Sequence, residues 1–151
     1  MYGYGPFSQI SVMRIICLAI ILLAFLTGCK PETVTVHPDS YIQWYYDENK
    51  LQFHVHLINE ENEEIKLEHL KIIIKDKNIV KALKQDDGKI SLGNTYTLGP
   101  NESRMVESEL IDFDPKGINE QMLNQAFYIQ LYVKETLIEY ELDSLNVVRE
   151  K

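Results

Sequence analysis

Alternation of apolar and polar residues between positions 51 and 58 constrains the fold of this chain more than any other feature. In this segment, LQFHVHLI, apolar residues occupy every second position and two histidines, His54 and His56, lie between them. Because successive side chains of a β-strand point to opposite faces, the pattern predicts a strand with one buried and one exposed face. The segment therefore predicts an antiparallel sheet that packs on one side.

Several other segments carry strand signals and are separated by turn-forming residues. The expected strands are 41–46, 65–75, short pieces within 90–98, 105–111, 127–133 and 137–142. A change of parity at Glu68 and His69 indicates a β-bulge, and helical spacing occurs at 77–84 and 119–126. About seven strands with regular turns predict an all-β, antiparallel immunoglobulin-like β-sandwich over residues 41–151, with one or two short helices.

Residues 96–103, YTLGPNES, resemble a recurrent turn of bacterial extracytoplasmic immunoglobulin-like domains. In those domains a Leu closes one strand, a Pro-containing pair forms the turn, and the next strand begins with polar residues. The resemblance implies the same sandwich architecture here. The chain lacks the Cys…Trp…Cys pattern of antibody domains. The resemblance is therefore to the immunoglobulin-like architecture and not to antibody domains themselves.

The N-terminal part has the pattern of an export signal. Residues 15–26, IICLAIILLAFL, form an apolar run preceded by Arg14. As a helix the run would rise about 18 Å, against a hydrocarbon core of about 30 Å. This length is typical of the apolar region of a signal peptide. Met13, directly before the arginine, is a more natural start than Met1.

The residues that follow the apolar run, Leu26-Thr27-Gly28-Cys29, resemble the lipobox of bacterial lipoproteins. The resemblance implies cleavage between Gly28 and Cys29 and a covalent diacylglycerol on the Cys29 thiol. Residues 1–28 are then a signal peptide, and residues 29–40 are the lipidated cysteine and a tether. A diacylglycerol supplies two acyl chains, which is what stable anchoring takes. The alternative is a plain signal anchor that ends in a chance cysteine.

Charge and cysteine content narrow the function classes. The 23 Asp and Glu residues against 15 Lys and Arg residues give a net charge of −8, which disfavours a nucleic-acid partner. Cys17 would be lost with the signal peptide and Cys29 consumed by lipid, so the mature protein would keep no thiol nucleophile. We expect a protein anchored on the extracytoplasmic face of the cell membrane by its lipid, with its acidic domain standing off an anionic surface.

Two groups of side chains are candidates for a binding site. His54 and His56 share one strand face and could place two imidazoles on a metal ion, although two solvent-facing histidines are the simpler interpretation, because no third ligand is fixed beside them. His37 lies in the expected tether and offers no fixed position. In the segment YIQWYY, Tyr41 and Tyr45 fall on one face, where they could bind a partner, and Trp44 on the face expected to enter the core.

The sequence shows no catalytic constellation. It has no serine-hydrolase elbow, phosphate loop or EF-hand spacing, and its runs of carboxylates are typical of solvated turns. The outward-facing Glu139 and Glu141 are the strongest carboxylate candidates. We therefore expect a non-enzymatic protein-binding or accessory module of the envelope, with no cofactor beyond the lipid at Cys29. The alternatives are a small-ligand or metal-binding lipoprotein using His54 and His56, and a small envelope hydrolase.

Overall fold

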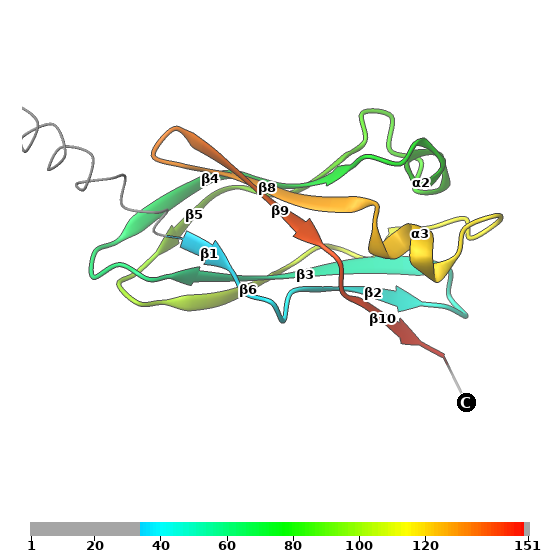
Figure 1. Ribbon diagram of the computed structural model, residues 1–151, viewed down its shortest axis with the longest axis horizontal. Helices are drawn as coiled ribbons and strands as arrows, with labels where there is room; N and C mark the ends of the chain where they lie inside the picture. The colour runs from blue at the N-terminus through cyan, green and yellow to red at the C-terminus, as the bar shows by residue number, and fades with distance from the viewer. Residues whose placement is uncertain (1–33, 150–151) are drawn as a thin grey trace, which may run out of the picture. The chain divides into compact units, whose positions relative to one another are not determined.

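The computed structural model describes residues 34–149, which form a sandwich of two β-sheets (Figure 1). The first sheet contains β1 (Val34–Val36), β2 (Tyr41–Tyr45), β3 (Lys50–Asn59), β6 (Ser103–Glu107), β7 (Ile111–Asp112) and β10 (Leu145–Val148). The second sheet contains β4 (Ile65–Ile74), β5 (Lys89–Leu98), β8 (Phe127–Val133) and β9 (Thr136–Leu142). The predicted all-β sandwich is confirmed.

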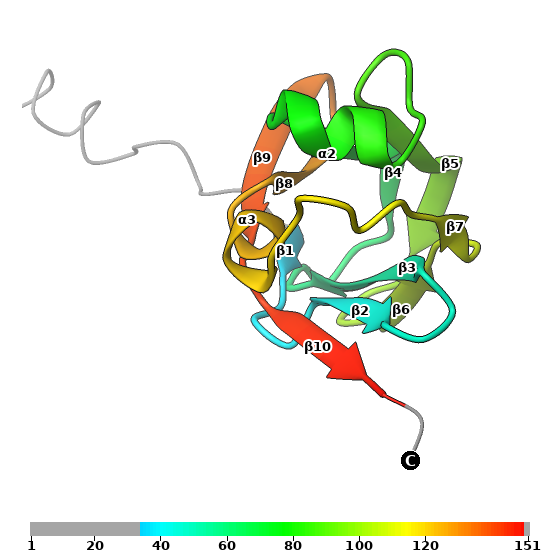
Figure 2. The same ribbon diagram turned by 90° about the vertical axis from the view of Figure 1, so that its right-hand side faces the viewer.

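Strand β3 is the centre of the first sheet. It pairs with β1 and β2 along one edge and with β6 and β7 along the other, while β10 adds to β2 in parallel. The second sheet has the order β5-β4-β8-β9 and is antiparallel throughout. The chain crosses between the sheets after β3, β5, β7 and β9, so the strands before and after each crossing lie in facing layers (Figure 2).

The core fills the space between the two sheets. The alternate apolar residues of β3 are buried, and Phe53 packs edge-to-face on Phe127 of the second sheet with 4.9 Å between ring centroids. Trp44 is also buried, with its ring against Phe113, as its position in the sequence predicts. Tyr46, two residues after Trp44, lies beyond the end of β2 and is 43% exposed.

Local irregularities follow the sequence signals closely. The predicted bulge in β4 is present, because His69 has a φ of 55° and the pairing with β8 shifts between Glu68 and Lys71. The two expected helices are α2 (Lys77–Ala82), capped by Asp76, and α3 (Glu120–Asn124), capped by Asn119. Among residues 34–149, neither helix is long and apolar enough to cross a membrane.

Two strands arise where the sequence predicts none. β1 lies inside the segment expected to be a tether, yet Val34 is fully buried and β1 pairs with the far end of β3. The folded domain therefore begins at least seven residues before the predicted boundary at Tyr41, since 41 minus 34 is 7. β10 pairs with β2 at the chain's other end. Both strands are too short to show a period, and only pairing with distant residues defines them.

The expected strand 105–111 is divided into two. β6 ends at Glu107 and β7 begins at Ile111. Between them, the Ser108 hydroxyl accepts a hydrogen bond from the Phe53 backbone N–H at 3.0 Å, in place of a strand carbonyl. Because the Ser108 hydroxyl replaces the backbone carbonyl that would continue the ladder with β3, regular pairing stops between β6 and β7.

The turn between β8 and β9 predicts a stabilising substitution. Lys134 and Glu135 have φ angles of 48° and 67°, the left-handed conformation that a two-residue type I′ turn requires and that Asn-Gly prefers. Replacing the pair by Lys134→Asn and Glu135→Gly is expected to stabilise the fold by about 1–2 kcal/mol in urea denaturation. A Lys134→Ala and Glu135→Ala control removes both charges and keeps the strain, so a gain there would contradict this explanation.

Candidate functional site

The edge of the first sheet is interrupted between β1 and β2. The pairings on either side of the interruption are Val36 with Leu57 and Tyr41 with His54. Residues 37–40 therefore lie opposite only Val55 and His56 of β3, four residues against two. The two extra residues must leave the plane of the sheet, so the sequence HPDS forms a turn beside His56.

Hydrogen bonds hold this turn to β3 from both sides. The His37 backbone N–H donates to the His56 carbonyl at 2.8 Å. The His56 backbone N–H donates to the Ser40 hydroxyl at 2.9 Å, and the Ser40 N–H closes the turn on the His37 carbonyl at 3.0 Å. Pro38 adds a fixed φ inside the turn. The backbone positions of the turn and of His56 are thus mutually determined.

The side chains of His37, Asp39 and His56 converge beside this turn. The Asp39 Oδ1 atom lies 2.6 Å from the Nδ1 atom of His37 and 2.6 Å from the Nδ1 atom of His56. The two imidazole centroids are 5.0 Å apart. One ligand atom from each residue falls within 4.8 Å of the others, which makes the cluster able to hold a metal ion.

Opposing effects act on the Asp39 carboxyl. Partial desolvation raises its pKa, but hydrogen bonds from His56 and His37, together with the charges of the two rings, outweigh that effect and lower the pKa below its usual value. Asp39 is therefore an ionised acceptor placed between two imidazoles. Its side chain is 55% exposed, so solvent reaches the cluster.

The predicted partner of His56 lies elsewhere. His54 is 6% exposed, its ring stacks on Tyr41 at 4.4 Å, and its Nδ1 atom lies 3.0 Å from Glu107 Oε1. It is not part of the cluster formed by His56, and it is not the solvent-facing side chain that alternation alone suggests. The sequence analysis missed Asp39 and set His37 aside, because both were assigned to a tether without fixed geometry.

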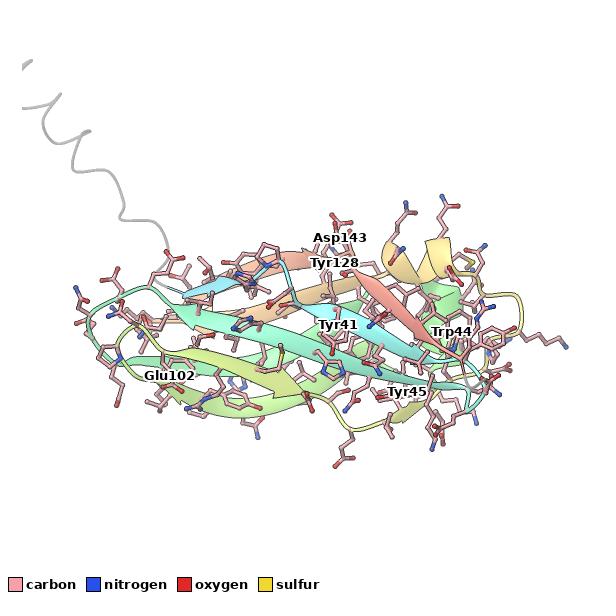
Figure 3. The ribbon with its side chains drawn as sticks, turned by 90° about the horizontal axis from the view of Figure 1, so that it is seen from below. Tyr41, Trp44, Tyr45, Glu102, Tyr128 and Asp143 are labelled. Carbon is pink, nitrogen blue, oxygen red and sulfur yellow. The ribbon has the colours of Figure 1, made fainter. Side chains whose placement is uncertain are left out.

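The predicted aromatic face is present on the outer side of the first sheet. Tyr41 and Tyr45 project from β2 on the same side, and both are half-buried (Figure 3). The Tyr45 hydroxyl donates to Gln52 Oε1 at 3.3 Å. Two exposed apolar side chains share this sheet: Val148, which pairs with Tyr45, is 38% exposed, and Met105 of β6 is 42% exposed.

The outward carboxylates of β9 are ordinary surface groups. Glu139 accepts a hydrogen bond from Lys75 Nζ at 2.7 Å, and this bond, opposed by desolvation, raises the pKa of Lys75. The bond thus favours the charged form of Lys75. A shallow groove of about 510 Å³ lies between β5 on one side and the segment from the end of β6 to β7 on the other. The groove is open and mainly polar. Lys89, Glu107 and Glu109 line it.

The lipidation and cleavage residues, Gly28 and Cys29, lie outside the described residues. Sequence comparison adds no assignment, since the chain matches no protein-family model and no curated protein. The candidate sites therefore depend on the local geometry of residues 34–149.

Proposed function

We propose that this chain is a bacterial lipoprotein, anchored through Cys29 to the extracytoplasmic face of the cell membrane, that binds another envelope protein without catalysing a reaction. Support for the anchor comes from the lipobox, Leu26-Thr27-Gly28-Cys29, at the end of the apolar run. Support for the binding role comes from the outer face of the first sheet, where the half-buried Tyr41 and Tyr45 lie on one side of β2. This aromatic face is the observation that carries the proposal.

The face has the composition of a protein-binding surface. Tyrosines offer large contact area with few rotatable bonds and a hydroxyl that can find a partner, which explains their enrichment at interfaces. Here Val148 and Met105 add exposed apolar surface around them. Between the tyrosines, Gln43 lies opposite Gln52 on the neighbouring strand. This combination suits a folded protein partner with a mixed apolar and hydrogen-bonding surface.

The early start of the domain restricts where that partner can be. Val34 follows Cys29 by five residues, which span at most about 17 Å when extended. A twelve-residue tether, from 29 to 40, would have reached more than twice as far. The domain is therefore held near the membrane surface, although residues 29–151, with 14 Lys and Arg against 23 Asp and Glu, carry a net charge of −9 that opposes contact with anionic lipid. A membrane protein, or another anchored protein, fits this position.

Cross-linking in cells tests the proposal. We expect the full chain to capture a dominant envelope protein, identified by mass spectrometry, and Tyr41→Ala with Tyr45→Ala to reduce that yield by about tenfold or more. The matched control is Tyr128→Ala with Tyr132→Ala, which removes two half-buried tyrosines from β8 in the second sheet. Equal loss in both variants, or unchanged capture in the first, would contradict the role of this face.

A result with no captured protein at good cross-linking yield would contradict the accessory role itself. It would favour the small-ligand or metal-binding alternative. Thermal unfolding of both variants separates lost binding from lost folding, because Tyr41 also covers the buried ring of His54.

A further inference from the structure

The turn between β1 and β2 gathers three metal-binding groups where the sheet edge is interrupted. His37 and Asp39 come from the turn, and His56 comes from the central strand β3, seventeen residues after Asp39. Chance clusters on protein surfaces consist mostly of carboxylates on flexible side chains. This cluster contains two imidazoles, and backbone hydrogen bonds to His56 determine where the turn lies.

We propose that His37, Asp39 and His56 form a binding site for a divalent transition-metal ion of the Zn²⁺ class. Two imidazole nitrogens and one carboxylate oxygen form a ligand set that suits zinc, with a fourth position left for water or a partner's group. Mg²⁺ and Ca²⁺ prefer sites made of oxygen ligands, so this set selects against them. The proposal is independent of the protein-binding face.

The donor spacing requires only a small adjustment. Zinc bonds of about 2.0–2.1 Å in a tetrahedral site place neighbouring ligand atoms about 3.3 Å apart. Asp39 Oδ1 now lies 2.6 Å from each Nδ1 atom, which is hydrogen-bonding distance. Binding therefore separates each pair by about 0.7 Å, a change that rotation of the exposed Asp39 and His37 side chains supplies.

The other ring nitrogen of His56 has the partner expected of a metal ligand. Its Nε2 atom is hydrogen-bonded to the Ser103 hydroxyl, at the start of β6. A histidine that donates through one nitrogen to a fixed oxygen presents the lone pair of the other nitrogen to a metal. Here that other nitrogen is Nδ1, which faces Asp39. Ser103 thus orients His56 from the opposite edge of β3.

In the metal-free protein, the hydrogen bonds to Asp39 need a proton on each Nδ1 atom. Zinc binding at Nδ1 needs the neutral tautomer that carries its proton on Nε2, so each ring exchanges its hydrogen bond with Asp39 for a bond to the ion. If the cluster were only a hydrogen-bonded clamp on the turn, zinc would not bind to it. Metal titration therefore separates the two roles.

The test is calorimetric titration of the full lipidated chain in detergent with Zn²⁺ alone. We expect one ion per chain, and affinity lower by at least about tenfold in both Asp39→Asn and His37→Asn. Asparagine keeps an oxygen that can accept the histidine hydrogen bonds, so Asp39→Asn leaves the turn intact. The matched control is His69→Asn, which removes an exposed histidine and suits its φ of 55°.

Co²⁺ provides a second measurement, because its absorption spectrum reports tetrahedral nitrogen and oxygen ligands. We expect a tetrahedral spectrum in the unmodified chain and in His69→Asn, and its loss in His56→Asn. The proposal is overturned if the unmodified chain gives no heat of binding with Zn²⁺. It is also overturned if Asp39→Asn and His37→Asn bind Zn²⁺ as tightly as the unmodified chain. The tyrosine variant Tyr41→Ala with Tyr45→Ala should bind zinc normally, so failure of one proposal leaves the other standing.

Discussion

Asn59→Ala is expected to destabilise the sandwich by about 2–4 kcal/mol, because it leaves several buried polar groups without partners at once. The Asn59 side chain is fully buried, and its Nδ2 atom donates to the carbonyls of Glu63 at 2.8 Å, Leu98 at 3.3 Å and Gly99 at 2.7 Å. Its Oδ1 atom accepts from the Glu61 N–H at 2.9 Å. One amide thus joins the loop after β3 to the turn after β5, linking the two sheets.

Urea denaturation of the purified protein measures this loss. Asn62→Ala is the matched control, because Asn62 lies in the same loop but is exposed and makes a surface hydrogen bond with Asn101. We expect that control to change stability by no more than about 0.5 kcal/mol. A loss below about 1 kcal/mol in Asn59→Ala would show that water replaces the amide and that the network does not hold the sheets together.

Cys29→Ala is expected to abolish attachment of lipid, because only a thiol at this position can form the thioether. In cells fed an alkyne-tagged fatty acid, the unmodified protein should be labelled and this variant should stay at background. Because each anchor carries two acyl chains, we expect the label on the two proteins to differ by more than about tenfold. The mass of this variant should also show that the residues before position 29 remain attached, since cleavage in lipoproteins follows lipidation. Cys17→Ala is the matched control, because it removes the other cysteine of the chain, which lies within the apolar run 15–26.

Two results would contradict the lipoprotein proposal. Label that persists in Cys29→Ala would place the acyl chains elsewhere, and an unlabelled normal protein would leave residues 15–26 as a plain signal anchor. In either case the domain could still bind its partner. Only its distance from the membrane would have to be reconsidered.

Much of the fold could be predicted from patterns that lie within one segment. The alternation in β3, the parity change at His69 and the helical spacing at 77–84 and 119–126 each act through neighbours a few residues away, and the structure confirms all of them. The buried position of Trp44 belongs to the same group, because it follows from the period of β2. Local periodicity was enough to establish a sandwich with two short helices.

The candidate metal site depends on something that no local pattern contains. His37 and Asp39 lie beside His56 only because β1 and β2 both pair with β3, with a four-residue turn opposite two residues. The sequence marks His56 as a polar-face residue of a strand, but it does not indicate which segment pairs with that strand or in which register. His54 meets Glu107 for the same reason, since β6 pairs along the other edge.

The sequence by itself thus determined most of the strand segments and the core-facing sides of β2 and β3. It gives lipid attachment at Cys29 only as an expectation from the lipobox. The tertiary structure alone decided that Val34–Val36 is part of the sheet and that a turn brings three donor atoms together. The physical reason is that side-chain period is a property of consecutive residues. Strand pairing and register instead depend on contacts between residues far apart in the chain.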